Sequence, residues 1–321
     1  MVYLLSKLFY NIFMKTFDNN KLHSEIDFGM PTLIELNSLK ENVELCKKLN
    51  LDFIELNMNI PFCTVLGYDE KNDFEKSDLL KSELENFINE LNFYQNEFGI
   101  YFTIHLDENF NFADMNPYVR KAYLQTLQNV IYNASKINCP IINMHLNRGV
   151  YFTLPTEKVF LFEKFSEQYN SSVNDFVKLC NEKIEDAKNK FCKKNSPLIC
   201  IENTDGWKDF EKKSLQKILE NKNFAITFDI GHSQGIGNLD EDFILKNKLK
   251  LKHFHVHDGT LPNTTTKQFG KNHLQLGTGN INLQNRIKLA KETSSRCVIE
   301  IKTVESLEES VKWIKKSIDT F

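Results

Sequence analysis

Short apolar segments alternate with longer segments of helical periodicity from about residue 26 to the end of the chain. The short segments are rich in β-branched or aromatic residues and nearly continuous in hydrophobicity, which is typical of parallel strands covered by helices. Because eight strand–helix units follow one another, the pattern predicts an α/β protein with a closed (β/α)8 barrel, or TIM barrel. The expected strands span residues 27–33, 52–57, 101–106, 141–146, 198–203, 225–230, 253–257 and 298–301.

Two of the expected helices begin at recognisable capping signals. Ser38 and Ser306 each precede a glutamate by three residues, which is the capping-box pattern in which side chain and backbone satisfy each other's hydrogen bonds. The segment 156–194 also carries apolar residues at helical spacing. We expect two helices there, separated near residues 170–172.

Residues 1–24 precede the first expected strand, and residues 25–321 are expected to form one catalytic barrel domain. Leu4, Leu8 and Phe9 follow helical spacing, so the first segment is expected to be a short helical extension. Its apolar face would pack on the barrel or on a second copy of the chain, as in a homo-oligomer. The run is too short to span a bilayer, and no membrane association is expected.

Charge and cysteine content narrow the choice of partner and compartment. The formal net charge of -3 gives no overall attraction for polyanions, so nucleic acid is not favoured as a partner. The seven cysteines are scattered and include no C-x-x-C pair. This usage suits a reducing cytoplasm, with the thiols as small core residues.

Polar residues concentrate where the expected strands end. A barrel gathers functional residues at the carboxyl ends of its strands, because the loops that follow converge on one mouth. Most of the eight histidines lie at or just beyond such ends, which random placement would not produce. The residues at these positions are Glu55, His105, His145, Glu202, Asp229, His255, His257 and Glu300, with His232 and His273 in the loops that follow.

Acidic residues that share one mouth favour a bound cation. Carboxylates close together repel each other and raise each other's pKa unless a positive charge neutralises them. Glu202 and Glu300 are the clearest cases, because each is an acid within an apolar strand, with a buried salt bridge as the alternative. Mixed carboxylate and imidazole ligands suit manganese, cobalt, zinc or magnesium. The sequence therefore predicts a divalent metal as cofactor.

The remaining strand-end residues have two interpretations each. Glu55 is either a substrate-binding group or a hydrogen-bonded support within the barrel mouth. His257 shares a strand face with His255, so it either binds substrate or fills the inner layer. His253 lies deeper on that face and is expected to be a core histidine. Trp207, after the fifth strand, either covers a substrate ring or packs between loops.

The order of these polar residues resembles that of the xylose-isomerase-like barrel superfamily, which includes sugar-phosphate isomerases and epimerases, inosose dehydratases and endonuclease IV. The resemblance covers nearly the whole chain from about residue 27. In the ketose-epimerase branch, Glu, Asp, His and Glu on strands five to eight bind the metal. The resemblance therefore implies that Glu202, Asp229, His255 and Glu300 are the metal ligands in this chain.

The three-zinc pattern of the endonuclease IV branch recurs only in part. His105, His145 and His273 match histidines of that pattern, and they are expected to bind either a second metal or substrate hydroxyls. An aspartate of that pattern is replaced by Lys271, whose charge would repel a third zinc ion. Another carboxylate, such as Asp258, would have to complete such a site. The replacement argues against a nuclease.

The resemblance implies a metal-dependent isomerase or epimerase of a sugar, sugar phosphate or other polyol. Glu202 and Glu300 would then move a proton next to a carbonyl through a metal-stabilised enediolate, while His232 orients a substrate oxygen. The alternatives are an endonuclease IV-like zinc-dependent abasic-site endonuclease or phosphodiesterase, an inosose-dehydratase-like lyase, and a barrel that binds without catalysis. No phosphate-binding loop of a defined type is present, so phosphorylation of the substrate stays open.

Overall fold

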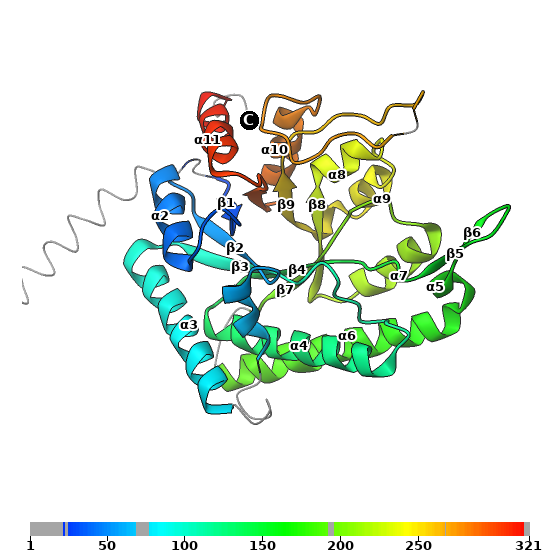
Figure 1. The fold of residues 1–321 in the computed structure, drawn as a ribbon, viewed down its shortest axis with the longest axis horizontal. Coiled ribbons are helices and arrows are strands. Elements are labelled where there is room, and N and C mark those ends of the chain that lie inside the picture. The colour runs from blue at the N-terminus through cyan, green and yellow to red at the C-terminus, as the bar shows by residue number, and fades with distance from the viewer. Residues whose placement is uncertain (1–21, 23–24, 69–76, 192–195, 267, 318–321) are drawn as a thin grey trace, which may run out of the picture.

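The computed structural model describes residues 22, 25–68, 77–191, 196–266 and 268–317. Eight parallel strands close into one barrel, in which β1 pairs with β10 and every other strand pairs with its neighbours along the chain (Figure 1). The predicted (β/α)8 barrel is therefore confirmed. The barrel strands are β1 (Phe28–Pro31), β2 (Phe53–Asn57), β3 (Tyr101–His105), β4 (Ile141–His145), β7 (Leu198–Glu202), β8 (Phe224–Asp229), β9 (Leu251–Val256) and β10 (Arg296–Ile299).

Helices cover the outside of the barrel, and their apolar faces pack against the outward side chains of the strands (Figure 1). The long helices are α2 (Leu39–Leu49), α3 (Ser77–Phe98), α4 (Pro117–Lys136), α6 (Ser166–Phe191), α7 (Asp209–Leu219), α10 (Leu283–Glu292) and α11 (Val304–Ser317). Shorter turns of helix are α5 (Leu161–Lys164), α8 (Ile230–Gly235), α9 (Glu241–Lys246), and the 3-10 helices η1 (Pro61–Gly67) and η2 (Lys248–Lys250). Within the described residues, no helix is long and apolar enough to cross a membrane.

One expected helix start is correct and the other is wrong. The Ser38 side chain accepts a hydrogen bond from the Glu41 amide at the start of α2, as the capping pattern predicts. Helix α11 already begins at Val304, before Ser306. There the Thr303 hydroxyl accepts the Ser306 amide, so threonine takes the place predicted for serine.

The segment after β4 differs from the expectation. Strands β5 (Tyr151–Thr153) and β6 (Lys158–Phe160) form an antiparallel hairpin that projects beside α5 (Figure 1). Helix α6 then runs without a break through residues 170–172, where the sequence suggested a boundary between two helices. The Ser172 hydroxyl donates to the Gln168 carbonyl within the helix, so this polar residue is accommodated without a turn.

The interior of the barrel is apolar near the amino ends of the strands and becomes polar toward their carboxyl ends. Ile141, Cys200 and Ala225, on the adjacent strands β4, β7 and β8, form a small apolar cluster near the amino ends of the strands. Side chains two residues further along point to the same face, and there the interior becomes polar. This polar region leads directly to the mouth. The predicted extension, residues 1–24, lies outside the described residues except for Leu22, so its expected helix stays a prediction.

Candidate metal centre

Four potential metal ligands meet at the carboxyl ends of four consecutive strands. Glu202 ends β7, Asp229 ends β8, His255 lies in β9 and Glu300 directly follows β10. Each offers a ligand atom, and these atoms all lie within 4.8 Å of one another. All four residues are buried. The structure thus brings together the whole ligand set that the resemblance implied.

Several buried polar atoms at this point have no hydrogen-bond partner among the described residues. They include His255 Nδ1, His232 Nδ1 and Glu300 Oε2. His255 Nδ1 lies 3.0 Å from Glu300 Oε2 and 3.2 Å from Glu202 Oε1. Buried polar atoms without partners are costly, and a cation among them would satisfy several at once. The residues therefore fit a divalent cation held by oxygen and nitrogen donors.

The titration of these groups reflects strong mutual attraction. Burial opposes ionisation of Glu202 and Glu300, but the charge of His255 holds the pKa of both carboxyls well below their usual range. Burial also opposes a charge on His255, yet Glu202, Glu55 and Glu300 raise its pKa well above the usual value. The carboxylates thus stay ionised and draw in positive charge, which a metal ion supplies in place of protons.

A polar layer directly beneath the ligands holds Glu202 in place. The Asn143 amide donates to Glu202 Oε2 at 2.5 Å, and the Thr227 hydroxyl donates to Asn143 Oδ1 at 2.6 Å. All three residues are buried, and strand pairing sets Glu202 beside Thr227. The position of the Glu202 carboxylate is therefore fixed by side chains from β4 and β8. This layer was not predicted from the sequence.

Asp229 is fixed by the turn that follows it. Its Oδ1 accepts the His232 amide at 2.6 Å, so Asp229 caps α8 and places His232 over the centre. His232 Nδ1 lies 3.2 Å from Asp229 Oδ2 and 3.5 Å from Glu202 Oε1. Burial works against a charge on His232, but Asp229 and Glu202 raise the pKa of its ring to about 10.

His257 lies behind Asp229, away from the cavity. Its Nδ1 accepts the His273 amide at 2.7 Å, so its proton is on Nε2, which lies 3.0 Å from the Asp229 carboxylate. Both ring nitrogens are therefore engaged, and the ring is fully buried. A side chain at Gly231 would collide with this ring, since a Cβ there would lie 1.9 Å from His257 Cε1. This position does not support the substrate contact expected for His257.

His105 and His145 approach the centre from β3 and β4, and His145 is paired directly with Glu202 in the barrel. Their Nε2 atoms lie 3.3 Å and 3.5 Å from the same oxygen, Glu202 Oε2. His105 Nδ1 is 2.6 Å from the Leu106 carbonyl, which requires a proton on Nδ1. In the neutral ring Nε2 then carries a lone pair that faces a carboxylate oxygen. A proton or a cation between them resolves this contact.

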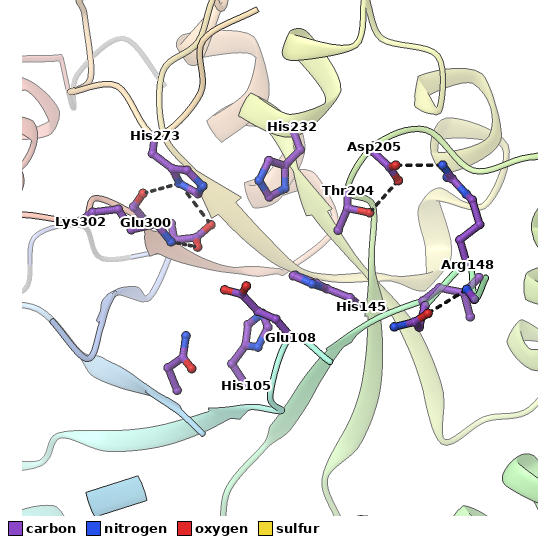
Figure 2. Close-up of a pocket in the computed structure, with 14 residues that line it drawn as sticks. His105, Glu108, His145, Arg148, Thr204, Asp205, His232, His273, Glu300 and Lys302 are labelled. Atoms are coloured by element: carbon purple, nitrogen blue, oxygen red, sulfur yellow. Dashed lines mark hydrogen bonds and ion pairs between the residues drawn. The ribbon is translucent and has the colours of Figure 1, made fainter. Parts of the chain in front are cut away.

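A cavity of about 440 Å³ opens over the centre (Figure 2). Figure 2 shows His105, His145, His232, His273 and Glu300 around it. Burial lowers the pKa of His273 to about 4, so its ring is neutral and suited to hydrogen bonding. The other lining residues are Asn57, Glu108, Leu146, Asn147, Arg148, Gly149, Thr204, Asp205 and Lys302.

Charged residues at the rim were not identified as site residues from sequence. Arg148 lies 2.8 Å from Asp205 and 3.1 Å from Glu211, so its guanidinium joins the loop after β4 to the segment after β7. Lys302 Nζ lies 2.7 Å from Glu300 Oε1. The sequence feature that could have identified Arg148 and Lys302 is their position just after the ends of the expected strands.

Three other residues lie away from the cavity. Trp207 is 5% exposed and its ring packs edge-on against Phe243, which favours packing between loops, the second of its two interpretations. Lys271 is exposed and does not line the cavity. Asp258 accepts four backbone amides, from Gly259, Gly277, Gly279 and Ile281, and is thus committed to shaping the loop after β9.

Glu55 lies beneath the centre rather than in the cavity. Its side chain is buried between His253 and His255, with both Nε2 atoms 2.9 Å from its oxygens. Direct contact with a substrate is therefore not supported by its position. His253 is fully buried, as a core histidine should be.

Comparison with known proteins identifies the family. Residues 43–317 match the model of the xylose isomerase-like TIM barrels, and the chain belongs to that family. The uncharacterized protein MJ1614 of Methanocaldococcus jannaschii is 26% identical over 224 residues, which are 68% of this chain and 78% of that protein.

Solved structures share the fold at low sequence identity. The structure of a D-tagatose 3-epimerase-like protein is 22% identical, with a TM-score of 0.63 over 92% of this chain and 97% of that one. Endonuclease IV from Thermus thermophilus is 13% identical, with a TM-score of 0.56 over 92% of this chain and 100% of that one. The barrel is thus common to proteins named for different reactions.

Proposed function

We propose that this xylose isomerase-like barrel is a divalent-metal-dependent isomerase or epimerase of a sugar or sugar phosphate. The observation that carries the proposal is the convergence of Glu202, Asp229, His255 and Glu300 beneath a polar cavity. The donor set suits manganese, cobalt, zinc or magnesium. The D-tagatose 3-epimerase-like structure supports the same class of substrate by analogy of fold.

The bound cation would act as a Lewis acid that stabilises negative charge on the substrate's carbonyl oxygen when a proton leaves the adjacent carbon. The protein's task is then to hold the substrate and to move that proton. Glu300 Oε2 faces His255 Nδ1, which leaves Oε1, beside Lys302, for proton transfer. Glu300 lines the cavity, so this oxygen lies next to a bound substrate.

We assign proton transfer on the opposite face of the same substrate carbon to Glu202. Glu202 lies beneath the residues that line the cavity: its Oε1 faces His255, and its Oε2 lies beside His105 and His145, which both line it. Two carboxylates on opposite sides of one carbon allow one to remove a proton and the other to return it. An epimerase needs both transfers, whereas an isomerase returns the proton to the neighbouring carbon.

The histidines of the cavity would orient the substrate. His232 lies beside the carboxylates and lines the cavity, and its ring nitrogens can bond a substrate oxygen. His105, His145 and His273 add ring nitrogens that can bond the hydroxyls of a polyol. His257 we assign to positioning Asp229, because its Nε2 proton faces that carboxylate.

The deciding experiment measures exchange of carbon-bound hydrogen with deuterated water. We expect the purified, metal-loaded protein to incorporate deuterium into at least one member of a panel of ketoses, ketose phosphates and inososes. Elemental analysis should find a divalent metal, and the near-isosteric variants Glu202→Gln and Asp229→Asn should lose both metal and exchange. Equal metal content in parent and variants would overturn the ligand assignment, and absence of exchange across the panel would overturn the reaction.

A second candidate, a zinc-dependent abasic-site endonuclease or phosphodiesterase, is favoured by the approach of both His105 and His145 to Glu202 Oε2. Such an enzyme needs further zinc sites. Lys271 is exposed and outside the cavity, so its charge does not stand at such a site, but Asp258, the carboxylate that would have to complete it, is bonded to four amides. Metal-dependent nicking of abasic duplex DNA that Glu202→Gln abolishes would favour this candidate. Loss of water from an inosose in the same panel would instead indicate a lyase.

We place the protein in the cytoplasm. The described cysteines, which exclude Cys192, are six buried free thiols. Burial raises the pKa of Cys46 and Cys180 above the ordinary thiol value, so these groups are protonated and unreactive. Thiols in this state suit a reducing compartment.

A further inference from the structure

A buried carboxylate from β2, which is separated from β9 by β1 and β10, contacts the histidine of the candidate metal centre. Glu55 lies on β2 and His255 on β9, and Glu55 Oε1 lies 2.9 Å from His255 Nε2. The other imidazole nitrogen, Nδ1, faces Glu202 and Glu300. His255 is therefore held between one carboxylate beneath it and the carboxylates of the centre.

The second oxygen of Glu55 is engaged as well. Glu55 Oε2 lies 2.9 Å from His253 Nε2 and 3.4 Å from the Thr103 hydroxyl. Strand pairing sets Glu55 beside Thr103, and all four residues of the group are buried. The two oxygens thus each face one imidazole. This arrangement leaves the carboxylate little freedom to turn.

We propose that Glu55 is a positioning residue that prepares His255 to bind the metal through Nδ1. The inference rests on the proposed metal site. A neutral imidazole carries one proton, and only the nitrogen without it can bind a cation. The carboxylates of the centre attract that proton to Nδ1, where it would block metal binding. Glu55 attracts it to Nε2, and so leaves the Nδ1 lone pair directed at the ligand site.

The same contact limits how far the ring can turn. An imidazole on the inner face of a strand can rotate about its side-chain bonds unless both edges are held. Here Nε2 lies 2.9 Å from Glu55 Oε1 on β2, a strand separated from β9 by β1 and β10, although the two groups are not aligned as a hydrogen bond. Glu55 therefore acts on the metal through His255, without contact to the cavity.

The main test replaces the carboxylate by the nearly isosteric amide in Glu55→Gln and measures metal affinity by competition with a chromophoric chelator. The new amide group would oppose the N–H of one of the two imidazoles, so His255 would have to change its protonated nitrogen or turn. Loss of such a support typically weakens metal binding about 10- to 100-fold. We expect a loss in that range for Mn²⁺ and Zn²⁺.

His253→Gln provides the matched control. His253 contacts the same carboxylate at the same 2.9 Å, but its ring does not belong to the four-residue ligand set. We expect this variant to be less stable to urea while its metal affinity stays within about threefold of the parent. Equal weakening of metal binding by both substitutions would mean that the network acts only through core stability, and would overturn the proposal.

A measurement on the parent protein keeps the proposal testable if Glu55→Gln does not fold. Long-range proton–nitrogen spectra of the zinc-loaded protein, labelled with ¹⁵N-histidine, report which ring nitrogen binds the metal and which carries the proton. We expect His255 to bind through Nδ1 with its proton on Nε2. Binding through Nε2 would overturn the role of Glu55. A parent protein without metal affinity would instead defeat the proposed function.

Discussion

The two halves of the barrel mouth differ in how many acids they bring to the centre. Strands β7–β10 provide three carboxylates and one imidazole within 4.8 Å, and each lies among buried partners. Strands β3 and β4 provide His105 and His145, which both face one oxygen of Glu202. Strands β1–β4 contain one acidic residue, Glu55, and its carboxylate oxygens contact His253 and His255.

This difference bears on how many metal ions the site can hold tightly. A divalent cation needs anionic donors of its own, and a second ion beside His105 and His145 would have to share Glu202 with the first. The Glu202 oxygen that faces these histidines, Oε2, already accepts a hydrogen bond from the Asn143 amide. We therefore expect one tight site on the β7–β10 side, while the β3–β4 side serves the substrate.

The largest expected effect on metal affinity comes from replacing a candidate ligand on strands β7–β10. Asp229→Asn removes one of the three charges that hold the cation and weakens the cap that places His232. We expect metal affinity to fall about 100-fold or more, with activity lost in parallel. Titration with Mn²⁺ under chelator competition measures the change. A variant that keeps parent affinity would contradict the assignment of this half as the metal centre.

A smaller effect is expected from the other half. His145→Asn removes a ring nitrogen that lines the cavity, and a lost hydrogen bond to a charged partner costs about 1.5–3 kcal/mol. That corresponds to a fall in kcat/KM of about 10- to 100-fold, with one tightly bound metal retained. Elemental analysis of parent and variant gives the stoichiometry. A parent with two ions and a variant with one would show that both halves bind metal.

A third substitution acts on the layer beneath Glu202. Asn143→Leu keeps a similar side-chain shape but removes the donor to Glu202 Oε2 and the acceptor of the Thr227 hydroxyl. We expect the free energy of unfolding to fall by about 1–3 kcal/mol and metal affinity to fall about tenfold. Urea denaturation and metal titration measure the two effects separately.

Thr227→Val is the matched control for this layer. It removes the donor to Asn143 but leaves the contact between Asn143 and Glu202 in place. Stability should fall by about 1 kcal/mol, with metal affinity little changed. If Thr227→Val weakens metal binding as much as Asn143→Leu, then the direct bond to Glu202 is not what matters.

The positions of two candidate ligands were predictable from the sequence alone because an acid in an apolar strand is costly unless it is paired or binds a cation, whereas Asp229 and His255 were added by the family resemblance. Glu202 and Glu300 both interrupt such strands, and the parallel barrel brings strand ends together by its own geometry. The supporting layer was not predictable in the same way. Asn143 and Thr227 lie within strands, and sequence alternation alone does not tell which polar residue faces a ligand.

The role of His257 and the shape of the β5–β6 hairpin illustrate the other limits. Both ring nitrogens of His257 are bonded by groups distant in the sequence, the Asp229 carboxylate and the His273 amide. Nothing in the pattern of residues 253–257 encodes those partners. The hairpin lies on segment 151–160, where short strands and helical spacing give similar apolar patterns.

The smallest expected effect concerns Lys302, which lies between the metal centre and solvent. Its Nζ is 2.7 Å from Glu300 Oε1, but 51% of its side chain is exposed, so water and salt weaken the pair. Lys302 competes with a metal ion for the charge of Glu300. Lys302→Met should therefore tighten Mn²⁺ binding by less than about tenfold, since it leaves the three carboxylates less neutralised.

The same substitution should lower kcat, because Glu300 Oε1 loses the contact that holds it in the cavity. Opposite signs for metal affinity and kcat distinguish this effect from all the others, in which both quantities fall or only kcat/KM falls. Lys302→Arg keeps the charge and should keep the parent metal affinity. The gain in affinity should also shrink as salt increases from low to physiological concentration. Weaker metal binding in Lys302→Met would mean that Lys302 orients Glu300 for the metal. Lys302 would then support the metal centre from the rim, as Asn143 does from beneath.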